Sequence, residues 1–472
     1  MNKLLSLYKN SSKGVKSSLA FALASAISAG MSYLTTPLFT RLLSSEEYGV
    51  VTVFLTWQSI FAIIAMFSLN YGVFNNGMMD YSNNRDEYSF SLLLLSNLIT
   101  TCFCVVLFLI KIAFPNAFDL EWKFIILMMI VYYFQPAYNF WLARQRYEYN
   151  YKPAFIAALL ISVFAPVISV ICVVLSFDKV EGRIFGLEGA LLVVYFCFYL
   201  YLGYKVKWKL NRNYWKEAFL FNLPLIPHYL SIYVLSSSDK LMISSMVGHS
   251  ATSYYSVSYT IASVALIFWG AINGSLIPYT YEKCRDNDFE SLKNKVNAII
   301  LVIAVCCVMV YLIAPEIMYV LGSSEYRDSV LVIPPIIGGV FFQVHYSLFA
   351  NVLYYYRKPK LVMLASITAA LVNIIANFFF IKRFGYIAAG YTTLFSYIIQ
   401  ASIDYYAMKY VTKQRIYDMH FIVYLSVFII LMSLGMPLLY SYTLLRYVLI
   451  ALFLLVALLF KNKIKNTISL VL

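Results

Sequence analysis

Apolar runs of about 20 residues recur along the whole chain and are separated by short polar stretches. A helix needs about 20 apolar residues to cross a hydrocarbon core of about 30 Å, so these runs are long enough to span a membrane. Transmembrane β-strands are shorter and alternate between apolar and polar residues, so the pattern predicts an all-α polytopic membrane protein with about fourteen transmembrane helices. The predicted spans are residues 17–39, 49–69, 89–110, 122–142, 154–176, 187–204, 217–238, 252–280, 296–314, 330–354, 361–381, 386–408, 419–440 and 443–460.

The first run also has features of a signal peptide. Basic residues precede an apolar stretch, and the small residues Ala24, Ser25 and Ala26 follow. However, the apolar run continues past Gly30 to Phe39, which favours a first membrane helix.

Composition points to lipid as the main solvent. Hydrophobic residues make up 62% of the 472 residues and charged residues 12%, whereas soluble domains are about half apolar and about a quarter charged. No stretch between predicted spans exceeds about 20 residues, and no phosphate-binding Gly-x-x-x-x-Gly-Lys-Ser/Thr loop occurs. The sequence therefore disfavours an attached ATPase, and the lack of a large external catalytic loop disfavours a membrane enzyme.

Basic residues predict the orientation, because cytoplasmic loops are enriched in Lys and Arg. With the N-terminus inside, 26 of the 36 Lys and Arg residues fall in cytoplasmic segments. Both termini are therefore expected in the cytoplasm. The net charge of +14 reflects this bias and predicts no nucleic-acid partner.

The seven cysteines suggest neither a disulfide framework nor a metal site. All but Cys284 fall inside the predicted spans, and their number is odd. We expect no metal and no cofactor.

Two landmarks suggest an internal duplication. Lys152-Pro153 opens the fifth span and Lys358-Pro359 the eleventh, with proline at a helix start where its missing N–H is tolerated. Phe185-Gly186 precedes the sixth span and Phe384-Gly385 the twelfth. An offset of six helices preserves orientation, so the halves are expected to be parallel repeats with the substrate between them. The predicted domains are an N-terminal six-helix bundle (1–210), a C-terminal six-helix bundle (211–412) and two additional helices (413–472).

Polar side chains recur at helical spacing within several spans. Residues three or four positions apart lie on one helix face, and such faces join helices through hydrogen bonds or line a water-filled cavity. The first reading is favoured for the small hydroxyl residues, and both stay open for the amides. The stripes comprise Ser25, Ser28, Ser32 and Thr35; Gln135 and Asn139; Gln343, Ser347 and Asn351; and Ser366, Asn373 and Asn377.

Few ionisable residues fall inside the spans. His228 follows Pro224 and Pro227 near mid-depth, as in the interrupted helices that line transporter sites, although a satisfied, neutral core histidine is the favoured account. The others are Arg41 at the outer end of the first span, the adjacent Asp239 and Lys240, a second mid-depth histidine at 345, and Asp404, which is expected at the cytoplasmic interface. Adjacent residues point to different sides of a helix, so Asp239 and Lys240 need other partners or water unless they snorkel to the interface.

Three segments carry a family resemblance. They are Thr36 to Leu43 with Glu47-Tyr48-Gly49, Pro224 to Lys240, and Asn373 to Gly390. On these segments the chain resembles the O-antigen and polysaccharide repeat-unit flippases of the Wzx type. That family belongs to the superfamily that also holds the lipid II flippases and the multidrug and toxin extruders. Two features depart from the pattern: Tyr254-Tyr255 replaces the usual Gly-Tyr, and two extra C-terminal helices are more typical of lipid II flippases.

The resemblance implies two six-helix bundles forming a V around a cationic cavity with alternating access, in a bacterial inner membrane. This cavity would hold the sugar–diphosphate head of an undecaprenyl-linked oligosaccharide while the polyprenyl tail stays in lipid. Arg41 and Asp239 match positions that the family keeps, and Lys240 stands where it often has Arg. The expected substrate-binding residues are Arg41, Lys240, Arg144 and Arg357 for the diphosphate, Gln135, Asn139, Gln343 and Asn351 for sugar hydroxyls, and Asp239 and His228.

The expected partners are the lipid-linked oligosaccharide, membrane lipid, Na⁺ or H⁺ as a coupling ion, and a polymerase of the same pathway. O-antigen and capsule repeat units are both compatible with the sequence. A lipid II flippase is the nearest alternative in chemistry. A multidrug extruder is the other alternative, although a cation carrier should have several buried carboxylates, and Asp239 is the one deep candidate that the pattern indicates.

Overall fold

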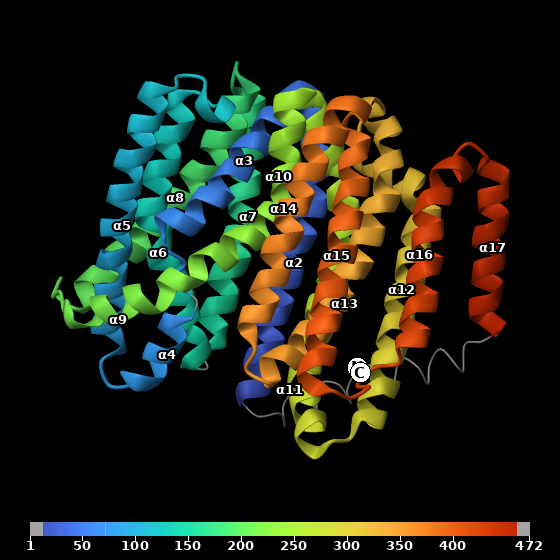
Figure 1. The fold of residues 1–472 in the computed structure, drawn as a ribbon. Coiled ribbons are helices and arrows are strands. Elements are labelled where there is room, and N and C mark those ends of the chain that lie inside the picture. The colour runs from blue at the N-terminus through green and yellow to red at the C-terminus, as the bar shows by residue number, and fades with distance from the viewer. Residues whose placement is uncertain (1–12, 71, 149, 460–472) are drawn as a thin grey trace, which may run out of the picture. The chain divides into compact units, whose positions relative to one another are not determined.

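The computed structural model describes residues 13–70, 72–148 and 150–459, and the regular secondary structure of this part is helical, without strands (Figure 1). Short helices α4 (Val73–Asp80) and η1 (Ala117–Asp119) lie in loops. The longer elements are α2 (Lys13–Leu42), α3 (Ser45–Ala65), α5 (Arg85–Ala113), α6 (Trp122–Tyr147), α7 (Tyr151–Leu175), α8 (Lys179–Lys205), α9 (Asn213–Asn222) leading through η2 (Leu223–Leu225) into α10 (Ile226–Met246), α11 (His249–Asp286), α12 (Phe289–Leu321), η3 (Ser324–Val332) leading into α13 (Ile333–Tyr355), α14 (Pro359–Phe384), α15 (Tyr386–Thr412), α16 (Met419–Leu439) and α17 (Thr443–Leu459).

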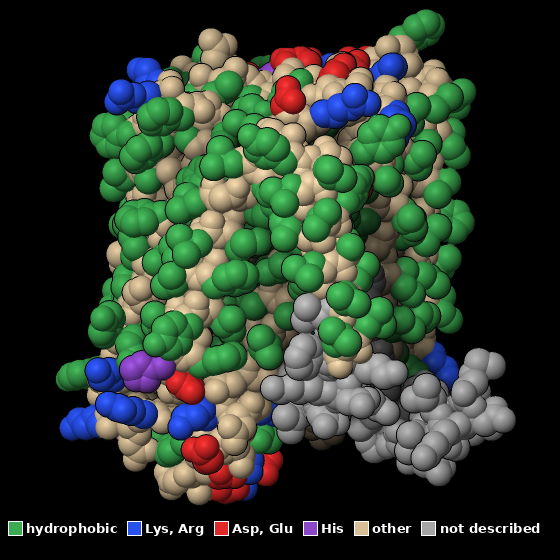
Figure 2. Space-filling view, turned by 90° about the vertical axis from the view of Figure 1, so that its right-hand side faces the viewer, with side chains coloured by type: hydrophobic (Ala, Val, Ile, Leu, Met, Phe, Trp, Pro, Cys, Tyr) green, Lys and Arg blue, Asp and Glu red, His purple; other side chains and the backbone are tan. Residues whose placement is uncertain are grey.

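Each predicted apolar run coincides with one of these helical segments, which confirms the all-α membrane fold class. Within the described residues, 11 helices are long and apolar enough to cross a membrane. The helix α15 falls outside that set because Thr392, Thr393, Ser396 and Gln400 interrupt it, and these side chains are buried in protein. Figure 2 shows one face on which hydrophobic side chains cover the middle band and charged side chains gather at the two ends, as expected for a protein surrounded by lipid.

Local polar signals set where several helices begin. At the start of α3, the Glu47 backbone N–H donates to Ser44 Oγ (3.2 Å) and the Ser44 N–H donates to Glu47 Oε2 (2.7 Å). This reciprocal capping box satisfies backbone groups that have no partner within the helix. Asp178 and Asp418 accept hydrogen bonds from the first turns of α8 and α16 in the same way.

The chain forms two compact units, Met1–Tyr233 and Val234–Leu472, which we call the N-terminal unit and the C-terminal unit. This division falls inside α10, whereas the sequence places domain boundaries at 210/211 and 412/413. The difference arises because α9 packs on α4 and α5, and because α16 packs on α12 and α13. The predicted boundaries follow from the proposed duplication of a six-helix unit, and that duplication stays a prediction.

One landmark of the predicted repeat is wrong. Gly385 separates α14 from α15 with a φ of 72°, a backbone conformation that glycine adopts without strain. Gly186, by contrast, lies inside α8, where an added Cβ would stand 2.8 Å from Cys172 Cβ and 2.9 Å from Ser169 Cα. Gly186 therefore lets α8 approach α7 closely, and the matching Phe-Gly dipeptides have different structural roles.

In the N-terminal unit, α8 contacts α3, α5, α6 and α7, and α2 packs on α7. The serine stripe of α2 contributes to this packing, since Ser28 Oγ hydrogen-bonds Ser162 Oγ of α7. The side chain of Ser25 lies outside the described part. These contacts support the reading of the stripe as a helix-joining surface.

The helix α13 is the centre of the C-terminal unit. It contacts α11, α12, α14, α15 and α16. Of the most apolar stretch of its span, 83% is buried within the protein, against 22% for α16. The helix α16 is therefore peripheral, and Tyr311 on α12 holds it through a 2.7 Å hydrogen bond to Ser433. An ion pair joins Arg446 of α17 to Glu316 of α12.

The helix boundaries show where reporter fusions can test the predicted topology. We predict that reporter fusions after Arg212 and after Arg415 read as cytoplasmic and that a fusion after Phe177 reads as external. The external fusion is placed after Phe177 because the loop between α7 and α8 comprises residues 176–178, whereas Phe185 lies inside α8. An external signal after Arg212 would contradict the orientation inferred from the basic residues.

Candidate functional site

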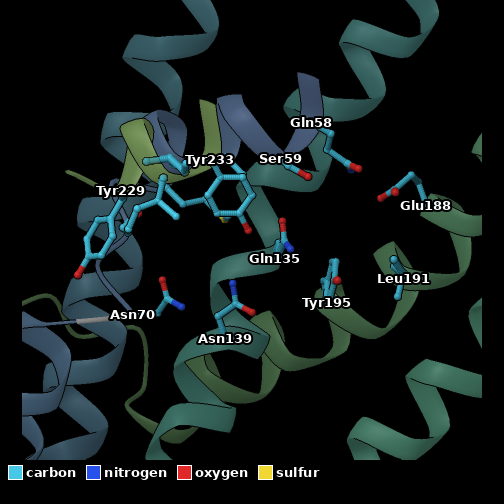
Figure 3. A pocket seen from close by; sticks show the side chains of 15 residues that line it. Gln58, Ser59, Asn70, Gln135, Asn139, Glu188, Leu191, Tyr195, Tyr229 and Tyr233 are labelled. Atoms are coloured by element: carbon cyan, nitrogen blue, oxygen red, sulfur yellow. The ribbon is translucent and has the colours of Figure 1, made fainter. Parts of the chain in front are cut away.

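A cavity of ≈ 500 Å³ lies within the N-terminal unit (Figure 3). Its walls are mostly polar or aromatic, although a membrane-spanning bundle surrounds it. The lining side chains come from α3 (Gln58, Ser59, Ala62, Ile63), the segment after α3 (Met66, Ser68, Asn70), α6 (Gln135, Asn139), α8 (Glu188, Leu191, Tyr195) and α10 (Tyr229, Ile232, Tyr233). We call it the amide pocket.

Two residues predicted to contact sugar hydroxyls, Gln135 and Asn139, lie side by side in this pocket (Figure 3). Their spacing of four residues places them on one face of α6. Tyr132, one turn earlier, is buried and donates from its hydroxyl to the Gln58 carbonyl (2.8 Å). This bond fixes α6 to α3 at the level of the pocket.

The end of α3 brings two further polar side chains to the pocket. Phe67 and Ser68 have φ values of 54° and 45°, so the chain leaves the helix in a left-handed turn and carries Ser68 and Asn70 to the wall. Two side chains fasten this turn: Asn222 Nδ2 donates to the Phe67 carbonyl (3.0 Å), and Thr100 Oγ1 donates to the Ala65 carbonyl (2.9 Å). The turn therefore has a fixed position in the unit.

Among the described side chains that line the pocket, Glu188 alone is of a charged type. It is 2% exposed, and the Gln58 side chain points toward its carboxyl group (Figure 3). The nearest cation along α8, Arg183, donates to Ser169 Oγ (2.8 Å) and lies 3.9 Å from the centre of the Phe39 ring. This pocket is therefore rich in amides and carries one acid. The cationic cavity between two six-helix bundles, which the family resemblance implies, is a different site and stays a prediction.

The four basic residues predicted to bind a diphosphate lie outside the pocket lining. Arg41 is exposed at the end of α2 and donates to the Pro37 carbonyl (2.8 Å). Lys240 is half-buried, with Nζ 5.3 Å from the Tyr259 ring centre, and Arg357 is exposed after α13. Arg144 is buried and pairs with Asp86 and with Glu148 (2.6 Å), so its charge is compensated within the protein.

Asp239 has partners from three other helices of the C-terminal unit. Its oxygens accept hydrogen bonds from Tyr255 of α11 (2.5 Å), Asn377 of α14 (2.6 Å) and Thr393 of α15 (2.5 Å), and it is 1% exposed. Asn373 extends the network, because its Oδ1 accepts from Asn377 (3.0 Å). These contacts supply the partners that Asp239 requires and give it a helix-joining position. Lys240 has the Tyr259 ring instead.

The remaining predicted amides and the histidines also lie apart from the pocket lining. Asn351 is buried and donates to Asn273 Oδ1 (2.8 Å), joining α13 to α11, and Gln343 is half-buried on the same helix. His228 is half-buried on α10, and its Nδ1 has no hydrogen-bond partner in the described part of the chain. His345 is 1% exposed and its Nδ1 contacts the Phe341 carbonyl (2.9 Å).

The expectation of an interfacial Asp404 is wrong. This residue is 0% exposed within the C-terminal unit, and neither carboxyl oxygen has a hydrogen-bond partner in the described part of the chain. The pattern of the sequence misleads here because Asp404 is near the end of a span, yet its helix α15 packs closely on α13 and α14.

Sequence reasoning missed Glu188, Gln58, Asn70 and Tyr195. A signal existed for Glu188, since it is the one acidic residue within the run 187–204, and ionisable residues inside membrane spans commonly mark functional sites. No comparable signal existed for Asn70, because a turn after α3 places it. Within the described residues, no cluster of three or more His, Cys, Asp or Glu side chains suggests a metal site.

The described residues form an all-helical membrane fold with a polar pocket inside it. The structure is similar to the lipid II flippase MurJ in an inward closed conformation, with a TM-score of 0.68 and 15% identity, over 94% of this chain and 100% of that chain. It is also similar to a multidrug resistance MATE family transporter in an inward-facing conformation, with a TM-score of 0.65 and 12% identity, over 82% and 96% of the two chains. At these identities the likeness shows a shared fold.

The family follows from the sequence. The profile of the family described as "Polysaccharide biosynthesis protein" matches residues 15–284, and this chain belongs to that family. A relative from Haemophilus influenzae, "Lsg locus putative protein 1", is 22% identical over 371 residues, which is 77% of this chain and 90% of that protein. Family and fold together confirm the resemblance to the polysaccharide repeat-unit flippases.

Two buried carboxyl groups of the C-terminal unit should respond oppositely to the same substitution. Asp239→Leu leaves the donors of Tyr255, Asn377 and Thr393 unpaired, and each buried unpaired group costs about 1–3 kcal/mol. Asp404→Leu removes a polar group that has no partner. We predict that Asp239→Leu lowers the melting temperature of the purified protein and that Asp404→Leu leaves it unchanged or raises it. Equal losses in both variants would contradict the assigned environments.

Proposed function

We propose that the chain is a flippase that translocates an undecaprenyl-diphosphate-linked oligosaccharide, an O-antigen or capsule repeat unit. It moves this lipid from the cytoplasmic to the periplasmic leaflet of a bacterial inner membrane by alternating access, with both termini in the cytoplasm. The observation that carries the proposal is the amide pocket inside a membrane-spanning unit of a polysaccharide biosynthesis protein. A polar cavity at such a place suits a cargo that is itself polar.

The lining suits a sugar. Gln58, Asn70, Gln135 and Asn139 each offer a carbonyl acceptor and two N–H donors, which match hydroxyl groups that both donate and accept. Tyrosine side chains supply flat apolar faces next to polar hydroxyls, as the two faces of a sugar ring require. The cavity volume of ≈ 500 Å³ falls within the range of about 300–1,000 Å³ typical of small-molecule sites.

The diphosphate needs positive charge, because moving an anion into hydrocarbon without compensation is very costly. Arg41, Lys240 and Arg357 remain the proposed diphosphate contacts. Arg144 is the weakest of the four because Asp86 and Glu148 already neutralise it. Transport by this mechanism uses a gradient of Na⁺ or H⁺ rather than ATP, and a polymerase of the same pathway would receive the product.

Two other cargoes fit the same fold. A lipid II flippase is supported by the likeness to MurJ over the whole of that chain, and lipid II shares the diphosphate and the sugar. A multidrug extruder is supported by one observation, the buried carboxyl group of Glu188 in the pocket, because a carboxylate attracts organic cations. Deleting the gene and identifying the lipid-linked intermediate that accumulates separates these cargoes.

The pocket amides should contribute to transport. We predict that the double variant Gln135→Leu/Asn139→Leu exports about tenfold less glycan per molecule of inserted protein, because each lost neutral hydrogen bond costs about 0.5–1.5 kcal/mol. Asn76→Leu is the matched control, since Asn76 is an exposed asparagine of α4 outside the pocket. Normal export by the double variant would remove the amide pocket from the mechanism.

The predicted diphosphate contacts are tested separately. Arg41→Ala and Lys240→Ala should each reduce export per inserted molecule about tenfold or more, since a charge-assisted hydrogen bond contributes about 1.5–3 kcal/mol. Arg41→Lys should rescue only partly, because lysine lacks the bidentate fork that arginine offers phosphate. If Arg41 only anchors α2, Arg41→Gln lowers the protein level and export in proportion. Unchanged export per molecule in both alanine variants would exclude a diphosphate role.

A further inference from the structure

The charge of the amide pocket is the feature that the proposed function does not use. Glu188 lies in a wall of amides, serines and tyrosines, and the lining described above includes no Lys or Arg. Arg183, on the same helix, is engaged with Ser169 and the Phe39 ring. Arg183 attracts the Glu188 carboxyl group electrostatically from outside the lining, so a ligand in the pocket meets the acid in the wall and no cation beside it.

A carboxylate has a clear preference among sugars. Its two oxygens only accept hydrogen bonds, so it pairs with the hydroxyl donors of a neutral sugar, and these bonds are strengthened by its charge. A sugar that carries its own carboxylate brings a second negative charge into the same enclosed space. Like charges repel strongly where water is scarce, so the same group that binds a neutral sugar excludes an acidic one.

We propose that Glu188 is the specificity-determining residue of the amide pocket and that it selects an uncharged sugar and rejects a uronic acid or other carboxylated sugar. The inference rests on the proposed function, since it names the class of sugar that occupies the pocket. Gln58 is the positioning partner, because its side chain points toward the Glu188 carboxyl group (Figure 3). Gln135 and Asn139 complete the contacts to the neutral ring.

The test measures binding to the full-length protein in detergent at pH 8.5, where the carboxyl groups of the pocket and of the probes are ionised, with three probes. The first is farnesyl diphosphate linked to a diglucoside, the second carries glucuronic acid in place of the terminal glucose, and the third is farnesyl diphosphate without sugar. Wild type should bind the glucose probe at least about tenfold more tightly than the glucuronate probe. Glu188→Gln keeps the shape of the side chain and removes the charge, so it should reduce this ratio to about threefold or less, mainly through tighter binding of the glucuronate probe.

Two further variants serve as an independent test and as a control. Asn139→Asp adds a second negative charge to the pocket and should widen the ratio about tenfold further, so it tests the proposal even if Glu188→Gln does not fold. Glu181→Gln is the matched control: Glu181 lies on the same helix, is half-exposed and pairs with Lys123 (2.6 Å) outside the pocket. It should leave the ratio unchanged.

The outcomes separate this inference from the function it rests on. If neither sugar probe binds more tightly than farnesyl diphosphate alone, the sugar-binding role of the pocket fails. If both sugar probes bind more tightly than the sugar-free lipid, but equally, the function stands and the selection by Glu188 is wrong. A ratio that Glu188→Gln leaves unchanged, or that Asn139→Asp does not widen, also overturns the selection.

Discussion

The absence of water from the hydrocarbon core is the constraint on which the structure depends. Every backbone N–H and C=O at that depth must find a partner within the protein, which explains why the spans of the described chain are helices. The same constraint applies to side chains. Asp239 accepts hydrogen bonds from three helices, and Asn351 bridges two. Polar residues are therefore the means by which the C-terminal unit fixes its helices against one another.

The same residue types have a second use in the N-terminal unit. Gln135 and Asn139 are only half-buried and face a cavity instead of another helix. The turn that ends α3 adds Ser68 and Asn70 to that cavity. The polar groups within the helices thus join helices, as Asp239 does, or line a cavity, as Gln135 does. Asp404, whose carboxyl oxygens have no partner in the described part of the chain, does neither. Asn222 and Thr100, which fasten the turn, are as important to the pocket as the residues that line it.

The sequence predicts the helices well because length and apolarity are properties of a continuous segment. It predicts Gln135 and Asn139 as neighbours because helical spacing is local as well. It fails where packing between segments decides the outcome: Gly186 lies inside α8 although its sequence context matches that of Gly385, and Asp404 is buried although it lies near a helix end. Asp239 and Glu188 are both buried acids, yet only contacts from distant helices reveal that one is enclosed by donors and the other lines a cavity.

A carrier must release what it binds, and this requirement gives the uneven distribution of charge a physical meaning. Charge-assisted bonds to a diphosphate are strong, so a pocket that surrounded the whole head group with cations would hold its cargo too tightly to turn over. Neutral amides contribute weaker bonds to hydroxyl groups. A single acid adds selectivity by repelling acidic sugars, and it adds few strong bonds that would slow release. Glu188 and the amides recognise the sugar, and basic residues outside the pocket recognise the diphosphate. Because recognition is divided in this way, no single contact needs to be strong. The cargo is then identified by the combination of contacts and not by the strength of any one of them.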